Sequence, residues 1–186
     1  MNDIRETIAK IICDIVPVDE IERNHRKDAL EWIASGAEIF RVAKPDIPPK
    51  HLISYFAVVD VKRSSLLLVD HIKAELWLPA GGHVEPGEHP GTTVERESME
   101  ELGLESNFIF DVPCLITQMT TVGKTAGHTD VSLWYVIKGN ANDPIEYEKR
   151  EFNGVRWFSF DEILDSDIAP FDPHMHRFVS KLKTLL

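Results

Sequence analysis

Residues 82–104 read GHVEPGEHPGTTVERESMEELGL, and this stretch decides the fold and the chemistry that the sequence predicts. Prolines and glycines in its first half predict a loop, and the charged second half predicts a helix that ends at Gly103. On that helix Glu97, Glu100 and Glu101 are three and four residues apart, so their carboxylates share one face. Carboxylates this close repel one another, and a hard divalent cation such as Mg²⁺ or Mn²⁺ would stabilise them.

An acidic helix face is more often solvated than functional, so the three glutamates alone are weak evidence of a site. Their surroundings strengthen the case. The stretch follows the spacing G-x5-E-x7-R-E-U-x-E-E-x-G-U, where U is an aliphatic residue. A match to its fixed positions arises by accident in about one chain in a million. One position departs from the pattern, because Ser98 stands where an aliphatic residue is required. We expect Ser98 to face the sheet and not the glutamates.

In this spacing the segment resembles the signature of the Nudix hydrolase family. The resemblance extends over roughly residues 50–165, through the stretches 76–82 and 155–163, and does not include the N-terminus. It implies an α/β (α+β) fold, a Nudix-type α/β/α sandwich with a central mixed sheet. It also implies a metal-dependent hydrolase that cleaves a pyrophosphate bond in a nucleotide, with Mg²⁺ or Mn²⁺ as the cofactor.

The same resemblance implies roles for individual residues. Glu97, Glu101 and the carbonyl of Gly82 would hold the metal, and Glu100 would be a further ligand or the group that takes a proton from water. Arg96 would orient these carboxylates, with Glu88 as its partner.

The general base and the residues that bind substrate are less well defined by the sequence. Glutamates outside the signature also qualify as the base: Glu146, Glu148 and Glu151. Cations that could meet a phosphate are His71 and Lys73 before the signature, His83 within it, and His128 after the loop at 123–127. A charged loop is more often solvated than catalytic, and a loop histidine more often has no contact with substrate. Lys73 is equally compatible with a solvated turn position. The aromatic residues Trp77, Trp157, Trp134 and Tyr135 are expected mainly in the core.

Two other functions remain open at this point. A diphosphate isomerase shares the Nudix fold but uses a cysteine that we cannot assign here, and its product would retain the phosphates of its substrate. A non-catalytic nucleotide-sensing module would have a degraded signature or an attached DNA-binding domain, and neither is evident. Sequence markers of particular substrates are absent, so the default substrate is a nucleoside triphosphate or a related nucleotide.

Composition limits the partners. The chain has 186 residues and a formal net charge of −11, which disfavours nucleic-acid polymers and anionic membranes. No apolar run approaches the ~20 residues of a membrane helix, and no signal peptide is visible. With 2 cysteines far apart in sequence, a disulfide framework is not expected. We therefore expect a cytoplasmic protein with a small-molecule nucleotide or other diphosphate substrate.

The first residues form a separate unit in this interpretation. We expect a helical extension over residues 1–44 and the hydrolase domain over 45–186, joined at a segment with three prolines between Lys44 and Lys50. Isoleucines at helical spacing predict an amphipathic first helix that ends before Pro17, and its apolar face would pack on the main domain or on a second subunit of a homodimer. A second helix begins at Asp19 and ends near Gly36. Strands are predicted over 51–60, 65–70, 76–83, 107–120, 129–138 and 154–160, with a closing helix over 173–186.

Overall fold

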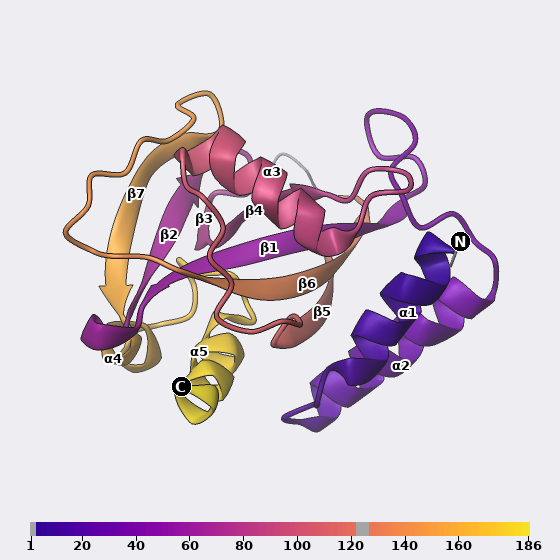
Figure 1. Ribbon diagram of the computed structural model, residues 1–186, viewed down its shortest axis with the longest axis horizontal. Coiled ribbons are helices and arrows are strands. Elements are labelled where there is room, and N and C mark those ends of the chain that lie inside the picture. Colours follow the sequence, from indigo (N-terminus) through magenta and orange to yellow (C-terminus); the bar gives the residue numbers. More distant parts are fainter. Residues whose placement is uncertain (1–2, 122–126) are drawn as a thin grey trace.

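The computed structural model of the chain describes residues 3–121 and 127–186 (Figure 1). Of the predicted loop at 123–127, only Gly127 lies inside the described residues. The helices are α1 (Ile4–Asp14), α2 (Glu20–Ala34), η1 (Val61–Arg63), α3 (Pro90–Leu102), α4 (Phe160–Asp165) and α5 (Met175–Leu185). The strands are β1 (Lys50–Asp60), β2 (Ser65–His71), β3 (Leu76–Leu78), β4 (Ala80–His83), β5 (Leu115–Thr120), β6 (Thr129–Lys138) and β7 (Phe152–Ser159).

Strand β1 is the centre of a mixed sheet. It runs parallel to β6 from Lys50, opposite Thr129, to Val59, opposite Lys138. On its other side it pairs antiparallel with β4 and then with β2. Strands β3 and β7 pair with β2, and β5 pairs antiparallel with β6. A parallel pair needs a long crossover, and here that crossover contains the helix α3.

Both faces of the sheet are covered, because alternate residues of its central strands enter two different cores. Phe56 and Val58 of β1 pack in one core together with residues of α1, α2 and α3. Ala57 and Val59 pack in the other core with residues of α4 and α5. Figure 1 shows α3 across one face and α5 beneath the other. This arrangement confirms the predicted α/β/α sandwich with a central mixed sheet.

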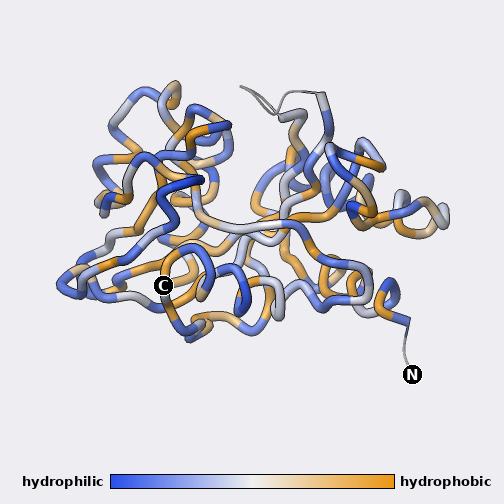
Figure 2. The backbone as a smooth tube through the Cα atoms, turned by 90° about the horizontal axis from the view of Figure 1, so that it is seen from above, coloured by the Kyte–Doolittle hydropathy of each residue, from blue (hydrophilic) through white to orange (hydrophobic). Residues whose placement is uncertain are grey.

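The N-terminal helices share the first of these cores. Ile8, Ile12 and Ile15 are buried at 0, 0 and 1% exposure and belong to the same cluster as the sheet residues. The isoleucine face therefore packs on the main domain, while a homodimer stays a prediction. Both views place α1 toward one end of the long axis of the molecule, away from the C-terminus (Figures 1 and 2). The boundary between residues 44 and 45 also stays a prediction.

A buried ion pair connects the extension to the C-terminal helix. Glu22 of α2 has no exposed surface, and its Oε1 accepts a hydrogen bond of 2.7 Å from Nζ of Lys181 in α5. Its Oε2 accepts from the backbone N–H of Val18 at 2.8 Å, and Oε1 also accepts from that of Ile116 in β5. Glu22 thus joins three segments that are distant in sequence.

Two strand predictions need correction. The strand expected over 107–120 begins only at Leu115, because Pro113 has no N–H to donate to a ladder. Residues 107–114 instead contact β6 at separate points, such as the bridge between Phe108 and Ile137. The strand expected over 76–83 is divided into β3 and β4 at Pro79. The other predicted elements agree with the structure to within about two residues, and Trp134 and Tyr135 lie in the core as expected.

Among the described helices, none combines the length and the apolar character that crossing a membrane requires.

The Glu22–Lys181 pair yields a stability prediction. Replacing Glu22 by alanine leaves the buried ammonium of Lys181 without its carboxylate, so we expect a loss of about 3–5 kcal/mol in the free energy of unfolding. Urea denaturation followed by circular dichroism measures this loss. The control Glu20→Ala removes an exposed carboxylate that pairs with Arg23 on the same helix, and should cost less than about 1 kcal/mol. Equal losses in the two variants would contradict the role of the buried pair.

Candidate functional site

One cavity of about 860 Å³ lies where β4, the start of β1 and the start of β6 meet α3 and the loop before β7. Carboxylates line one part of it: Glu97, Glu101 and Glu151, with Gly81 and Gly82 beside them. Cationic side chains and histidines line other parts: Arg41, Lys44, Lys73, His71, His83 and His128. The cavity is therefore large enough for a nucleotide-sized molecule and contains charges of both signs.

Arg96 holds the signature loop against the helix. Its Nε and Nη2 donate to the two carboxylate oxygens of Glu88, each at 3.1 Å. Nη1 donates to Glu97 at 2.5 Å, and Nη2 also donates to the backbone carbonyl of His83 at 3.2 Å. Burial alone would raise the pKa of Glu88, but the hydrogen bonds from Arg96, the backbone of Glu85 and Thr93 lower it overall. The loop before α3 is consequently fixed by charge-assisted hydrogen bonds, in the pairing of Arg96 with Glu88 that the sequence predicts.

Glycine at position 82 leaves room for the close approach of Glu97. A Cβ atom on Gly82 would lie 2.1 Å from Oε1 of Glu97, so any larger residue at this position would displace the Glu97 carboxylate. The neighbouring N–H of Gly81 donates to Oε2 of Glu101 at 3.0 Å. The end of strand β4 and two glutamates of α3 are therefore in direct contact, which is where the sequence places a metal site.

Glu101 lies among other carboxylates. It is only 7% exposed, and burial raises its pKa to about 9, with further contributions from Glu97 and Glu151. Burial likewise raises the pKa of Glu97. Glu97 and Glu101 are largely buried, and the exposed Glu151 lines the same cavity. Carboxylates gathered in this way fit a divalent cation, because its charge would replace the repulsion between them by attraction.

Glu100 lies differently from the other two signature glutamates. Its side chain is 63% exposed, it contacts Nη1 of Arg96 at 3.7 Å, and it is absent from the described lining of the cavity. Of the three candidate bases outside the signature, only Glu151 lines the cavity. The sequence could not separate Glu151 from Glu146 and Glu148, because all three belong to one acidic loop.

The four residues predicted to meet a substrate phosphate all line the cavity: His71, Lys73, His83 and His128. His71 also has a local structural role, because its Nδ1 accepts hydrogen bonds from the N–H groups of Lys73 and Ala74, each at 3.1 Å. Burial lowers its pKa. Lys73 is exposed. His128 is 6% exposed and contacts two aspartates, Asp46 at 3.5 Å and Asp130 at 3.2 Å.

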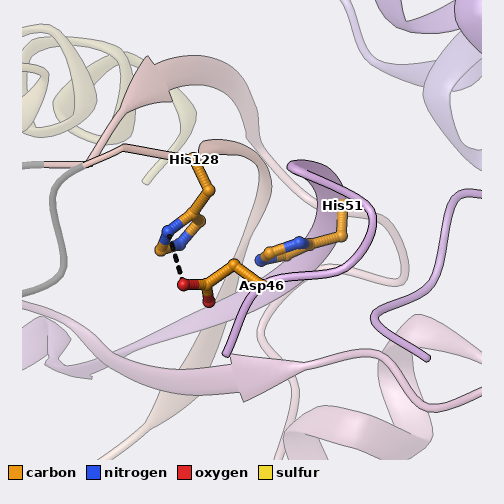
Figure 3. Close-up of side chains that lie close together, drawn as sticks. All are labelled: Asp46, His51 and His128. Atoms are coloured by element: carbon orange, nitrogen blue, oxygen red, sulfur yellow. Dashed lines mark ion pairs between the residues drawn. The ribbon is translucent and has the colours of Figure 1, made fainter. Parts of the chain in front are cut away.

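A histidine cluster in the cavity region was not predicted as a unit. Within the described part of the chain, two groups of three residues bring possible metal ligands within 4.8 Å of one another: Asp46, His51 and His128, and His51, His83 and Asp130. The rings of His51 and His128 stack with centroids 4.9 Å apart, and Asp46 lies beside His128 (Figure 3). The sequence offered one signal of this cluster, because His128 and Asp130 are two residues apart at the start of a predicted strand. Their proximity to His51, however, depends on the parallel register of β1 and β6.

The contacts of Ser98 explain why a polar residue stands where the signature has an aliphatic one. The side chain is fully buried, and its hydroxyl contacts the carbonyl of Leu104 at 2.9 Å and the hydroxyl of Ser106 at 2.7 Å. Ser98 thus connects the helix α3 to the chain that follows it. As expected, it does not belong to the glutamate face.

Comparison with known proteins agrees with this geometry. The model of the NUDIX domain family matches residues 50–181. An RNA pyrophosphohydrolase of Rickettsia rickettsii (strain Sheila Smith) is 30% identical over 121 residues, which cover 59% of this chain and 73% of the relative. The RNA pyrophosphohydrolase of Rickettsia prowazekii (strain Madrid E) is similar to the same extent, at 30% identity over 121 residues.

Solved structures agree with the fold. A NUDIX family hydrolase from Clostridium perfringens superposes with a TM-score of 0.57 at 21% identity, covering 73% of this chain and 98% of that one. A C. elegans Ap4A hydrolase superposes with a TM-score of 0.56 at 19% identity, covering 72% of this chain and 96% of that one.

The buried hydroxyl of Ser98 yields a prediction that runs against the signature pattern. Ser98→Leu restores the aliphatic residue of the pattern, yet we expect it to lower the free energy of unfolding by about 1–3 kcal/mol, since it adds volume at a filled position and removes the contact with Leu104. Met99→Leu, at a neighbouring position that is 50% exposed, is the matched control and should be nearly neutral. Urea denaturation measures both variants, and a more stable Ser98→Leu protein would show that the hydroxyl contacts are dispensable.

Proposed function

The chain belongs to the NUDIX domain family and is a pyrophosphohydrolase, and we propose which bond and which substrate it acts on. In this proposal it hydrolyses a pyrophosphate bond of a nucleoside triphosphate or related nucleotide, with Mg²⁺ or Mn²⁺ as the cofactor. The observation that carries the proposal is the meeting of Glu97, Glu101 and Glu151 beside Gly82 in a nucleotide-sized cavity.

In the proposed site, Glu97, Glu101 and the carbonyl of Gly82 hold the divalent cation. Glu100 contributes from the rim, where its exposed carboxylate contacts Arg96. Oxygen donors suit Mg²⁺ and Mn²⁺, and a helix and a strand hold them without flexible loops. When bound, such a cation neutralises phosphate charge and lowers the pKa of a coordinated water.

Arg96 and Glu88 act as positioning residues. Arg96 donates to Glu97 and is held in place by two hydrogen bonds to Glu88, so its guanidinium sets the direction of a proposed metal ligand. The same guanidinium binds the carbonyl of His83, which follows Gly82 directly. Arg96 therefore holds α3 and strand β4 at a fixed separation. A fixed separation is needed to keep the attacking water aligned with the substrate phosphate.

Glu151 is the residue that we assign to proton removal from the attacking water. It lines the cavity and its charge acts on both Glu97 and Glu101. Glu100, which the family resemblance implied as an alternative, is less suited to this role because it is absent from the described lining of the cavity. A base outside the helix leaves the α3 carboxylates free to hold the cation throughout the reaction.

The substrate phosphates would lie toward the cationic lining of the cavity. Arg41, Lys44 and Lys73 supply positive charge there, and His71 and His128 supply ring nitrogens. These local charges attract a small anion even though the whole chain carries a net charge of −11. A free nucleotide suits this combination, and the cytoplasm is the compartment that we propose for the protein.

The curated relatives favour a second candidate substrate, the 5′ end of an RNA. Their printed name is RNA pyrophosphohydrolase, and they share 30% identity with this chain over 121 residues. The net negative charge favours the free nucleotide, because an RNA chain would be repelled outside the cavity.

Glu101→Gln tests the proposed function. We expect this variant to lower kcat by two orders of magnitude or more while unfolding as the wild type does, because the amide removes charge from the cation site without changing its shape. The assay is release of phosphate and pyrophosphate from nucleoside triphosphates, nucleotide conjugates and a short 5′-triphosphorylated RNA, with Mg²⁺ and with Mn²⁺. Glu95→Gln, an exposed position on the same helix, is the matched control and should retain activity.

The panel also discriminates between the alternatives. Selective turnover of free nucleotides supports the proposed substrate, and selective turnover of the RNA supports the second candidate. Consumption of an isoprenoid diphosphate without phosphate release would indicate an isomerase, and tight nucleotide binding without turnover would indicate a sensor. Normal turnover by Glu101→Gln would refute the proposed site.

A separate prediction concerns the base. Glu151→Gln should lower kcat by about 10²–10⁴-fold with little change in KM, because the amide cannot take a proton from the attacking water. Glu146→Gln, in the same acidic loop but outside the cavity lining, should stay within a few-fold of wild type. If Glu100→Gln produces the larger loss and Glu151→Gln does not, the base lies within the signature.

A further inference from the structure

The histidine cluster contains a second, chemically different set of possible metal ligands. Three adjacent strands supply it: His51 from β1, Asp130 from β6 and His83 from the end of β4. In the parallel pair, His51 is directly opposite Asp130. His83 is opposite Ile53, two residues along β1 and therefore on the same face as His51. Sheet pairing, and not a flexible loop, brings these three side chains together.

The distances match the spacing of ligands around one ion. Nε2 of His51 lies 3.0 Å from Nε2 of His83 and 3.3 Å from Oδ1 of Asp130. In a tetrahedral zinc site with bonds of about 2.0–2.1 Å, the ligand atoms are about 3.3 Å from one another. The two separations from His51 thus match those that a shared ion imposes, and all three ligand atoms lie within 4.8 Å of one another.

Hydrogen bonding orients His51 for this role. Its Nδ1 lies 2.9 Å from the carbonyl oxygen of Pro48, and a carbonyl can only accept, so Nδ1 carries the proton. In the neutral ring, Nε2 then presents a lone pair toward His83 and Asp130. A ring N–H bound to a carbonyl on the side away from the ion is the usual support of a metal-binding histidine.

Asp130 has an unsatisfied oxygen. Among the described residues, its buried Oδ1 has no hydrogen-bond partner, although ring nitrogens of His51 and His128 lie 3.3 and 3.2 Å away. One proton shared between His51 and His83 would satisfy those two rings but not this oxygen. A cation satisfies all three atoms, and a buried carboxylate without compensation is costly.

From these contacts we propose that His51, His83 and Asp130 bind one transition-metal ion of the Zn²⁺ class, separate from the hard cation held by the glutamates. Two imidazoles and one carboxylate suit Zn²⁺ better than Mg²⁺, which prefers oxygen ligands. His83 and Asp130 also line the cavity, so the fourth ligand would be water or an anionic oxygen of a molecule bound there. His128 contacts Asp130, and Asp46 contacts His128 on the side shown in Figure 3, where His51 is the member of the proposed site that is drawn.

Metal binding tests the proposal without reference to turnover. Full-length protein freed of metal by a chelator is titrated with Zn²⁺ against a chromogenic competitor, and with Co²⁺ followed by the visible absorption of the four-coordinate ion, both in excess Mg²⁺. We expect one tightly bound Zn²⁺ per chain. Asp130→Asn and His83→Asn should each weaken its binding at least 10-fold, and His89→Asn, at an N-cap histidine outside the cluster, should not.

A variant of the other site separates this proposal from the proposed function. Glu101→Gln should leave Zn²⁺ affinity unchanged within about 2-fold. Circular dichroism confirms that Asp130→Asn and His83→Asn are folded, and His128→Asn supplies a third variant next to the site. Loss of Zn²⁺ binding in Glu101→Gln together with its retention in both ligand variants would place the ion at the glutamates and overturn the proposal. Absence of tight Zn²⁺ binding by the wild type would also overturn the proposal. The cluster would then be interpreted as an ion pair between His51 and Asp130.

Discussion

The pairing of β1 with its neighbouring strands is the constraint on which the rest of the structure depends. Its residues alternate between the two cores, so one strand organises both faces of the sandwich. Its parallel partner β6 brings Asp130 beside His51, and its antiparallel partner β4 brings Gly82 to the cavity. Because backbone hydrogen bonds set these registers, a shift of one residue would turn each of these side chains to the opposite face. The strand pairing of β1 therefore determines both the packing of the core and the position of the candidate site.

The second constraint is electrostatic, because negatively charged side chains lie close together at a place where burial destabilises their charged form. Glu101 is buried beside Glu97, and its pKa rises to about 9 because of burial and of the charges of Glu97 and Glu151. Such an arrangement costs stability in the free chain and is tolerated where a bound cation compensates for it. Arg96 offsets part of the repulsion, but it is already engaged by Glu88. The remaining negative charge is what the proposed divalent cation would neutralise.

The sequence predicted those features that depend on local spacing. The signature at residues 82–104 predicted the loop, the helix α3 and its end at Gly103, because these depend on residues close in sequence. The proximity of Glu97 to Gly82 was implied by the family resemblance, which made both of them contacts of one metal ion. The sequence did not predict the meeting of His51 with Asp130, since strand order and register are set by contacts between distant segments. It also overextended the strand before Leu115, because apolar composition outweighed the missing N–H of Pro113 in that interpretation.

The two proposed cation sites differ in donor chemistry, and strand β4 connects them. Neighbouring residues of a strand point to opposite faces, so Gly82 can offer its backbone to the glutamates while the ring of His83 contacts His51. The carbonyl of His83 accepts a hydrogen bond from Arg96, which also binds Glu97. A displacement of β4 at one site would therefore change ligand distances at the other. Oxygen donors on one side and imidazoles on the other allow two different divalent ions to occupy one cavity without competing for the same ligands.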